Sequence, residues 1–388
     1  MERYKKIIAS TSPILKLIEE GFTPDEIKEG VIELLNPYFE NKKLLNTFAI
    51  EQLIADSITL EKIKEDGRFV GVLEKILLIY RLALKKEPTS CYQSIELLEP
   101  SIAESQVKFW SILNLEVDKG KLPLYEFLHE CLRNIGDFIE GLAKPYLRSL
   151  LLQIRITEGM QNSLTNIDQL DLGEIIDELI RKTDFVDFFS PAPWNIRLNQ
   201  WRNIAHHESA KIENNQIICW YGRAPNIKEA RLTREELMSA VKTLYLVFIV
   251  LKMAYSLFIF DNIEDISKHV LFSEAREEVD FVPFAAGLAS QGFEILNYDV
   301  SAEKASLVVK DHASLDIKRR KIHASQFLFP LWLQTNSRTV FVEYCENDGI
   351  TRCIFTIDTE VCRKYSEGSL DLEELAMAVQ RFEIKKDG

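Results

Sequence analysis

Two adjacent histidines, His206 and His207, follow closely behind Arg202 and Asn203 in a chain of 388 residues that has only six histidines. An imidazole titrates near neutral pH and can move a proton, whereas a guanidinium is always charged and can hold a phosphate through two hydrogen bonds. Cleaving an RNA phosphodiester without a metal needs a base for the 2′-hydroxyl, an acid for the leaving oxygen and a cation for the phosphorane. The segment 202–207 carries these kinds of group and predicts this chemistry.

Helical spacing determines which of these side chains act together. On an α-helix Asn203 and His207 share one face, and Arg202 and His206 share a second face about 100° away. Neighbouring histidines on a helix seldom bind one ion, and no cysteine or carboxylate nearby has ligand spacing, so we predict no metal and no cofactor. His206 either supports the reaction or interacts with the helix end as a cation, and we assign it a supporting role.

The run Arg202-Asn203-Ile204-Ala205-His206-His207 resembles the R-[polar]-x-x-x-H signature of HEPN domains. The segment 132–140 also looks like an early helix of such domains, and the resemblance covers roughly residues 122–262. It implies a small helical bundle that carries the motif late, before a final helix. It also implies a metal-independent endoribonuclease in which Arg202 binds the scissile phosphate, Asn203 orients the site and His207 transfers protons.

The same resemblance implies the partners. Active HEPN proteins dimerise, bring two motifs into one cleft, and leave a 5′-hydroxyl and a 2′,3′-cyclic phosphate. Many act on transfer RNA or messenger RNA in toxin–antitoxin or anti-phage (abortive infection) systems, so RNA, a second copy and an antitoxin or regulator are the expected partners. Two other interpretations stay open. In the first, the domain is a non-catalytic HEPN scaffold that serves dimerisation, nucleotide sensing or partner binding. In the second, the arginine and the histidines are an ordinary surface cluster on a helix.

Cations and aromatic rings surround the motif. Between residues 195 and 234 the sequence has seven Lys and Arg against three Glu, a local balance of +4 in a chain of formal net charge −13. Arg197, Arg223 and Trp201 are candidate RNA contacts, since such rings stack on exposed bases and such cations bind phosphates. The alternative for the tryptophans is a place in the core. A second basic run, residues 318–321, predicts a solvated strand edge or loop, or a phosphate contact.

Asp137 and Glu140 lie three residues apart on a predicted helix upstream of the motif. Residues at this spacing lie on one helical face. They either form an exposed acidic face or reach the cleft, where a carboxylate can orient the catalytic arginine. We retain both interpretations.

The elements that position the motif are mostly helical. We predict a mainly α protein with an N-terminal helical region (1–100), a HEPN-like helical domain (101–265) and a C-terminal α+β domain (266–388). Pro88 and Pro100 end the first region, Pro145 interrupts a helix, and residues 216–221 form a short strand. In the tail, residues 347–349 predict a hairpin between strands, and residues 370–382 a closing helix.

Composition restricts the class of protein. With 46% hydrophobic and 28% charged residues the chain is an ordinary globular protein, and its net charge argues against sequence-blind binding to nucleic acid. Six scattered cysteines and no apolar segment after the first residues predict buried thiols in the cytoplasm. The apolar run 244–260 carries Lys252 at its centre and is slightly short for a membrane span, so we expect a bundle or interface helix and no membrane.

Overall fold

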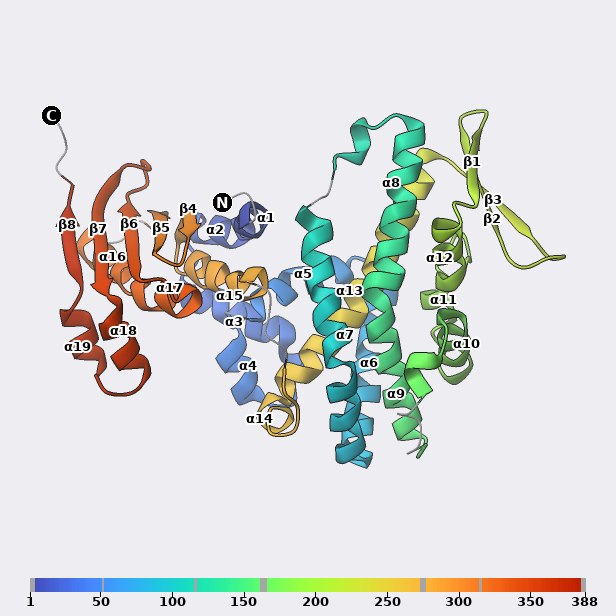
Figure 1. The fold of residues 1–388 in the computed structure, drawn as a ribbon, viewed down its shortest axis with the longest axis horizontal. Helices are drawn as coiled ribbons and strands as arrows, with labels where there is room; N and C mark the ends of the chain where they lie inside the picture. Colours follow the sequence, from blue (N-terminus) through green and yellow to red (C-terminus); the bar gives the residue numbers. More distant parts are fainter. Residues whose placement is uncertain are drawn as a thin grey trace. The chain divides into compact units, whose positions relative to one another are not determined.

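The chain divides into two units that differ from the three predicted segments. The computed structural model describes residues 4–50, 52–114, 117–160, 166–272, 277–313 and 316–384. One unit comprises residues 1–34, 46–55 and 275–388, and the other comprises residues 35–45 and 56–274. The predicted region 1–100 is therefore split between the units: the first helices pack with the α+β tail, and the later ones belong to the unit that carries the motif (Figure 1).

The unit that carries the motif is a helical bundle with one small sheet. Its first elements are η2 (Asn36–Tyr38), α4 (Lys42–Phe48), α5 (Ile54–Lys64), α6 (Gly67–Lys86), α7 (Pro88–Asn114), η3 (Lys119–Lys121), α8 (Leu124–Gly136), the π-helix η4 (Asp137–Ala143) and α9 (Lys144–Thr157). They are followed by α10 (Leu172–Lys182), α11 (Val186–Phe189), α12 (Leu198–His206), β1 (Ala210–Glu213), β2 (Gln216–Tyr221), β3 (Lys228–Leu232), α13 (Arg234–Asp261) and α14 (Ile263–Ile266). The predicted strand 216–221 is the central strand of an antiparallel sheet of order β1-β2-β3.

Helix α13 is the core of this bundle. Thr233 and Glu236 form a capping box at its start, with each side chain hydrogen-bonded to the other residue's backbone N–H. The helix packs against α6, α8, α9 and η4. Within the described part of the chain it is the one helix long and apolar enough to cross a membrane, but 67% of its most apolar window is buried inside the structure. That burial is what a bundle core requires.

Two prolines that we expected to interrupt helices do not. Helix α7 continues through Pro100, because its buried face runs on from Cys91 and Leu98 to Ile102 against α9 and η4. Pro145 is the second residue of α9, and the preceding turns widen into the π-helix η4 instead of breaking. A proline ring clashes with the carbonyl four residues earlier, and a wider turn relieves that clash. Because α7 runs on through Pro100 without a break, the predicted boundary at residue 100 was wrong.

The second unit combines helices with a five-stranded sheet. Its helices are α1 (Lys5–Ser10), α2 (Ser12–Glu19), α3 (Pro24–Leu35), α15 (Glu277–Ser290), α16 (Ile317–Ser325), α17 (Leu328–Thr335), α18 (Thr359–Ser366) and α19 (Leu372–Met377). Its strands are β4 (Phe293–Val300), β5 (Lys304–Asp311), β6 (Thr339–Cys345), β7 (Thr351–Asp358) and β8 (Gln380–Glu383), in that spatial order. Only β5 and β6 pair in parallel. The expected C-terminal α+β part and the hairpin between β6 and β7 are confirmed.

Two predictions for this unit were wrong. The closing helix ends at Met377, and residues 380–383 pair instead with the open edge of β7. The basic run 318–321 lies on helix α16, not at a strand edge or in a loop. Its Arg320 is buried and donates to both carboxylate oxygens of Asp311 at 2.8–3.0 Å, so it serves the core of this unit. A buried guanidinium needs such a partner, since an unpaired buried charge is costly.

Candidate functional site

Helix α12 carries the motif and is anchored by one apolar face. Leu198, Trp201 and Ile204 recur every three residues and are buried, against α8, α10, η4 and β2. Trp201 is 0% exposed and packs edge-on to Trp194 at a centroid distance of 6.2 Å. The prediction that Trp201 contacts RNA was therefore wrong, because no face of its ring reaches solvent. Its role is to seat the helix so that Arg202 and Asn203 point outward.

Arg202 is held in place by a carboxylate 62 residues earlier in the chain. Its Nε donates to Oε2 of Glu140 at 2.9 Å, and its Nη1 donates to Oδ1 of Asn203 at 3.1 Å. Arg202 and Glu140 retain 28% and 30% side-chain exposure, so the pair lies at the surface of the bundle. Two nitrogens of the guanidinium are thus oriented by the protein, and the fork stays accessible to an anion from solvent. Of the two interpretations of Glu140, the arginine-orienting one is the one that the structure supports.

The π-helix η4 presents Glu140 to this arginine. Lys144, one turn later, also donates a hydrogen bond to Glu140. It binds Oε1, the carboxylate oxygen that Arg202 does not bind. Burial opposes the charge on Glu140, but the hydrogen bonds from Lys144 and Arg202 outweigh it and lower the pKa of this carboxyl. Glu140 is therefore ionised at neutral pH and holds Arg202 through a charged hydrogen bond. A π-helix widens the turn locally, and such segments are frequent at functional sites.

A cleft of about 320 Å³ opens beside the Arg202–Glu140 pair. Its walls come from α7, α8, η4 and α12, and the residues that line it are Lys108, Leu132, Arg133, Gly136, Asp137, Glu140, Gly141, Ala205 and His206. Gly136 lies where α8 faces α12, and a β-carbon there would make only ordinary van der Waals contacts, 3.7 Å from Cβ of Ala205 and 4.0 Å from Nε2 of His206. Burial raises the pKa of Asp137, although Arg133, at 3.2 Å, opposes the rise. The cleft thus brings the imidazole of His206 near the carboxylates of Asp137 and Glu140. Arg202 does not line the cleft and is connected to it through its hydrogen bond to Glu140.

The two histidines occupy different places. His206, which we predicted to be supporting, lines the cleft at the end of α12. His207 is the C-cap residue, is exposed, and is not among the residues that line the cleft. Glu208 follows with φ 46° and ends the helix. His207 is therefore accessible to a large ligand that covers the end of α12, and His206 to the cleft itself.

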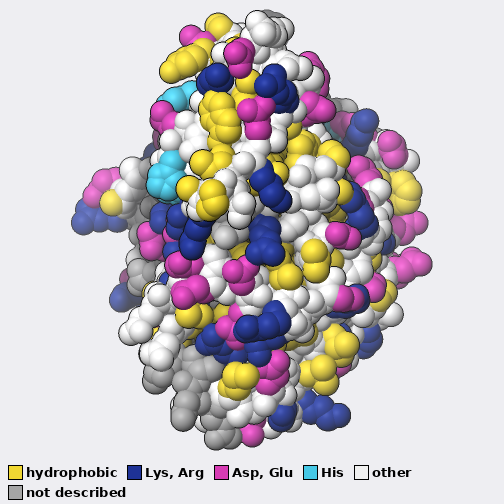
Figure 2. All heavy atoms as spheres, turned by 90° about the vertical axis from the view of Figure 1, so that its right-hand side faces the viewer, with side chains coloured by type: hydrophobic (Ala, Val, Ile, Leu, Met, Phe, Trp, Pro, Cys, Tyr) yellow, Lys and Arg dark blue, Asp and Glu magenta, His cyan; other side chains and the backbone are white. Residues whose placement is uncertain are grey.

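The predicted cationic surroundings are largely neutralised. Arg197 lies at the other end of α12, where it pairs with Asp177 at 2.5 Å, and Arg223 lies in the exposed β2–β3 loop, away from the cleft. Lys211 pairs with Glu213 and Arg231 with Glu229. Figure 2 shows Lys/Arg and Asp/Glu side chains interspersed on this side of the molecule. The balance of +4 that we counted along the sequence is therefore not a continuous basic patch.

Sequence reasoning missed three cations of the site. Two of them line the cleft: Lys108 on α7, and Arg133, which also donates to Asp137. The third is Lys144, which donates to Glu140. The spacing of Glu140 and Lys144, four apart, was the signal that could have indicated one of them. The described residues hold no group of three His, Cys, Asp or Glu side chains that could bind a metal ion.

We expect Glu140→Gln to act on the RNA cleavage that the motif predicts more than on stability. The glutamine can still accept from Arg202, but it loses the charge that orients the guanidinium, so the RNA cleavage rate should fall about 10- to 100-fold. The unfolding free energy should change by less than about 1 kcal/mol, because the pair is partly exposed. The matched control is Glu178→Gln, which alters a similar pair of contacts, to Arg155 at 2.5 Å and to Lys182 four residues later, none of which lines the cleft. Equal losses of cleavage in both variants would contradict the positioning role.

Comparison of the chain with protein-family models, with curated proteins and with solved structures gives no match.

Proposed function

We propose that this chain is a metal-independent endoribonuclease of the HEPN type. The observation that carries the proposal is the arginine of the motif, held by Glu140 at the rim of a cleft with two histidines within five residues of it. An oriented guanidinium stabilises a phosphorane, and imidazoles at neutral pH supply the acid and the base. In this proposal Arg202 binds the scissile phosphate, Asn203 orients the site and His207 transfers protons. His206 has a supporting role beside these three residues.

The substrate and setting follow from the same proposal. A site of this kind acts on RNA with a 2′-hydroxyl, and transfer RNA or messenger RNA is the proposed target, in a toxin or anti-phage effector of the cytoplasm. The exposure of Asn203 and His207 supports a site that a second copy completes, so we propose a homodimer. An antitoxin or another regulator would cover the same surface. No membrane and no cofactor enter the proposal.

Cleavage of total cellular RNA by the purified chain in excess EDTA tests the proposal. The wild type should give discrete fragments with 2′,3′-cyclic phosphate ends, and the double variant Arg202→Ala/His207→Ala should give none. Equal cleavage by both proteins would assign the activity to a contaminant and refute the proposal. If neither protein cleaves but the wild type still binds RNA or dimerises, the non-catalytic scaffold becomes the better function. The carboxylates that neutralise Arg202 and Arg197 are the observation that favours that second candidate.

A further inference from the structure

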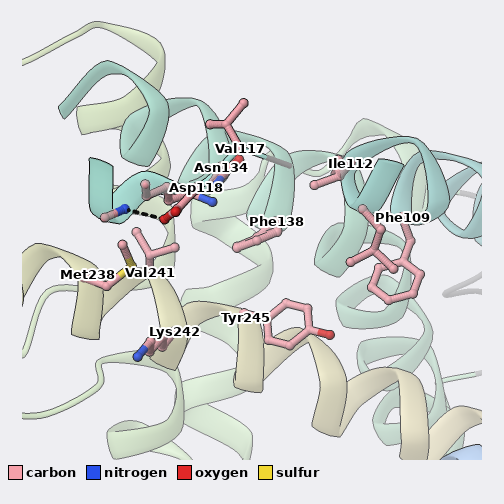
Figure 3. A pocket seen from close by; sticks show the side chains of 13 residues that line it. Phe109, Ile112, Val117, Asp118, Asn134, Phe138, Met238, Val241, Lys242 and Tyr245 are labelled. Atoms are coloured by element: carbon pink, nitrogen blue, oxygen red, sulfur yellow. Dashed lines mark hydrogen bonds between the residues drawn. The ribbon is translucent and has the colours of Figure 1, made fainter. Parts of the chain in front are cut away.

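A second cavity lies in the same bundle, and its chemistry differs from that of the cleft. It has a volume of about 450 Å³, opens to solvent, and is lined by residues of α7, α8, η3, η4, α13 and the segment just before η3. Figure 3 shows Asn134 beside Asp118 and Val117 in one part of this pocket and Phe109 and Ile112 in another, with Phe138 between them. Its volume falls in the range of small-molecule sites, which are mostly apolar with a few placed polar groups.

Aromatic and aliphatic side chains form the body of the pocket. The rings of Phe138 and Tyr245 are 5.4 Å apart between centroids, and Phe109 lies on the α7 side. Val241 and Met238 add aliphatic surface from α13. A flat aromatic body would therefore bury its apolar surface here and contact ring edges and faces, which is the favoured geometry of aromatic pairs.

One polar atom in this pocket has no partner. Asn134 is 3% exposed, and its Oδ1 accepts no hydrogen bond within the described structure. Buried polar groups are almost always satisfied, so an unpaired acceptor in the wall of a cavity points to a donor that the pocket's occupant brings. Asp118, which lies beside it, does not supply that donor, because its carboxylate accepts from the Gly120 N–H and pairs with Lys121 at 2.9 Å.

Two lysines line the pocket, and of these Lys119 is buried. Lys242 lines the pocket and is exposed, and its ammonium forms no ion pair with any residue the structure describes. An anionic group on the ligand would pair with it while the apolar body fills the interior. We infer that the pocket binds a small aromatic anion that carries an N–H or O–H donor, with Asn134 accepting that hydrogen bond and Lys242 binding the charge.

The pocket and the cleft share their walls. On α7, α8 and η4 three pairs of consecutive residues each turn one side chain to the cleft and the next to the pocket. These pairs are Lys108 and Phe109, Arg133 and Asn134, and Asp137 and Phe138. A ligand in the pocket would thus contact the same helical turns that carry the cleft's charged groups. The inference that the pocket binds this ligand does not rest on the proposed function. Only an effect of the ligand on RNA cleavage would rest on it.

The test uses two fluorescent probes on the full chain. 8-Anilinonaphthalene-1-sulfonate has an aromatic body, an amine donor and one sulfonate, and N-phenyl-1-naphthylamine is the same molecule without the sulfonate. The sulfonated probe should bind one site with a Kd on the order of 10 μM, from the efficiency of ligands of this size. The uncharged probe should bind about tenfold more weakly. A titration that does not saturate would overturn the inference.

Variants assign the site. Lys242→Gln should weaken the sulfonated probe about tenfold and leave the uncharged one unchanged, whereas Lys85→Gln, an exposed lysine of α6, should change neither. Asn134→Leu should weaken both probes several-fold, and Val241→Phe, which fills the pocket, should abolish both. If Val241→Phe fails to fold by circular dichroism, the other two variants decide. Equal Kd values in wild type, Lys242→Gln and Asn134→Leu would refute the site. No arm depends on RNA cleavage, so failure of the nuclease proposal leaves this result intact.

Discussion

Replacing His207 by alanine is expected to slow RNA cleavage about 10²- to 10⁴-fold, the range for loss of a group that transfers protons. The residue is exposed at the end of α12, so the fold should be unaffected. The measurement is the single-turnover rate on a defined RNA against pH. The wild type should cleave faster than the variant at every pH tested.

The matched control for this experiment is the neighbouring histidine. His206→Ala removes an imidazole that lines the cleft, and a supporting role predicts a loss of less than about tenfold, below the usual range for a proton-transfer group. The reverse order, with His206→Ala the severe variant, would assign proton transfer to His206. The signature-based assignment of His207 would then be wrong, and the cleft would be the site of chemistry in the isolated chain.

Arg202→Ala is expected to reduce cleavage about 10²- to 10³-fold, as the loss of one preoriented group that stabilises the transition state does. Arg202→Lys should recover only part of the rate, because an ammonium lacks the planar fork that binds two phosphate oxygens. The loss should appear in the rate at saturating RNA, since the phosphorane gains charge that the bound substrate lacks. Circular dichroism should show the same helical content in both variants.

Arg197→Ala is the matched control for Arg202→Ala. Arg197 precedes the same helix and is also paired with a carboxylate, Asp177, but it lies at the opposite end from the cleft. We expect a change of less than about threefold, in line with the small energies of exposed ion pairs. Comparable losses in both arginine variants would indicate general electrostatic binding of RNA by the helix. They would contradict a specific role for Arg202.

The sequence by itself determined the local features of this protein. The hairpin at residues 347–349 depends on contacts within a few residues, so composition and spacing suffice to predict it. The chemical content of the motif is equally local. The mainly helical class with a small C-terminal α+β part also follows from periodicity, because each element must bury one face.

Only the tertiary structure decided which groups meet. Glu140 reaches Arg202 across 62 residues, and Trp201 and Arg320 proved to be buried although their neighbours are polar. Carboxylates from distant helices neutralise cations that look unpaired along the chain. The continuation of α7 through Pro100 likewise depends on packing that outweighs a local penalty of about 3 kcal/mol. Such pairings depend on how segments far apart in sequence pack together, and a local pattern carries no record of that.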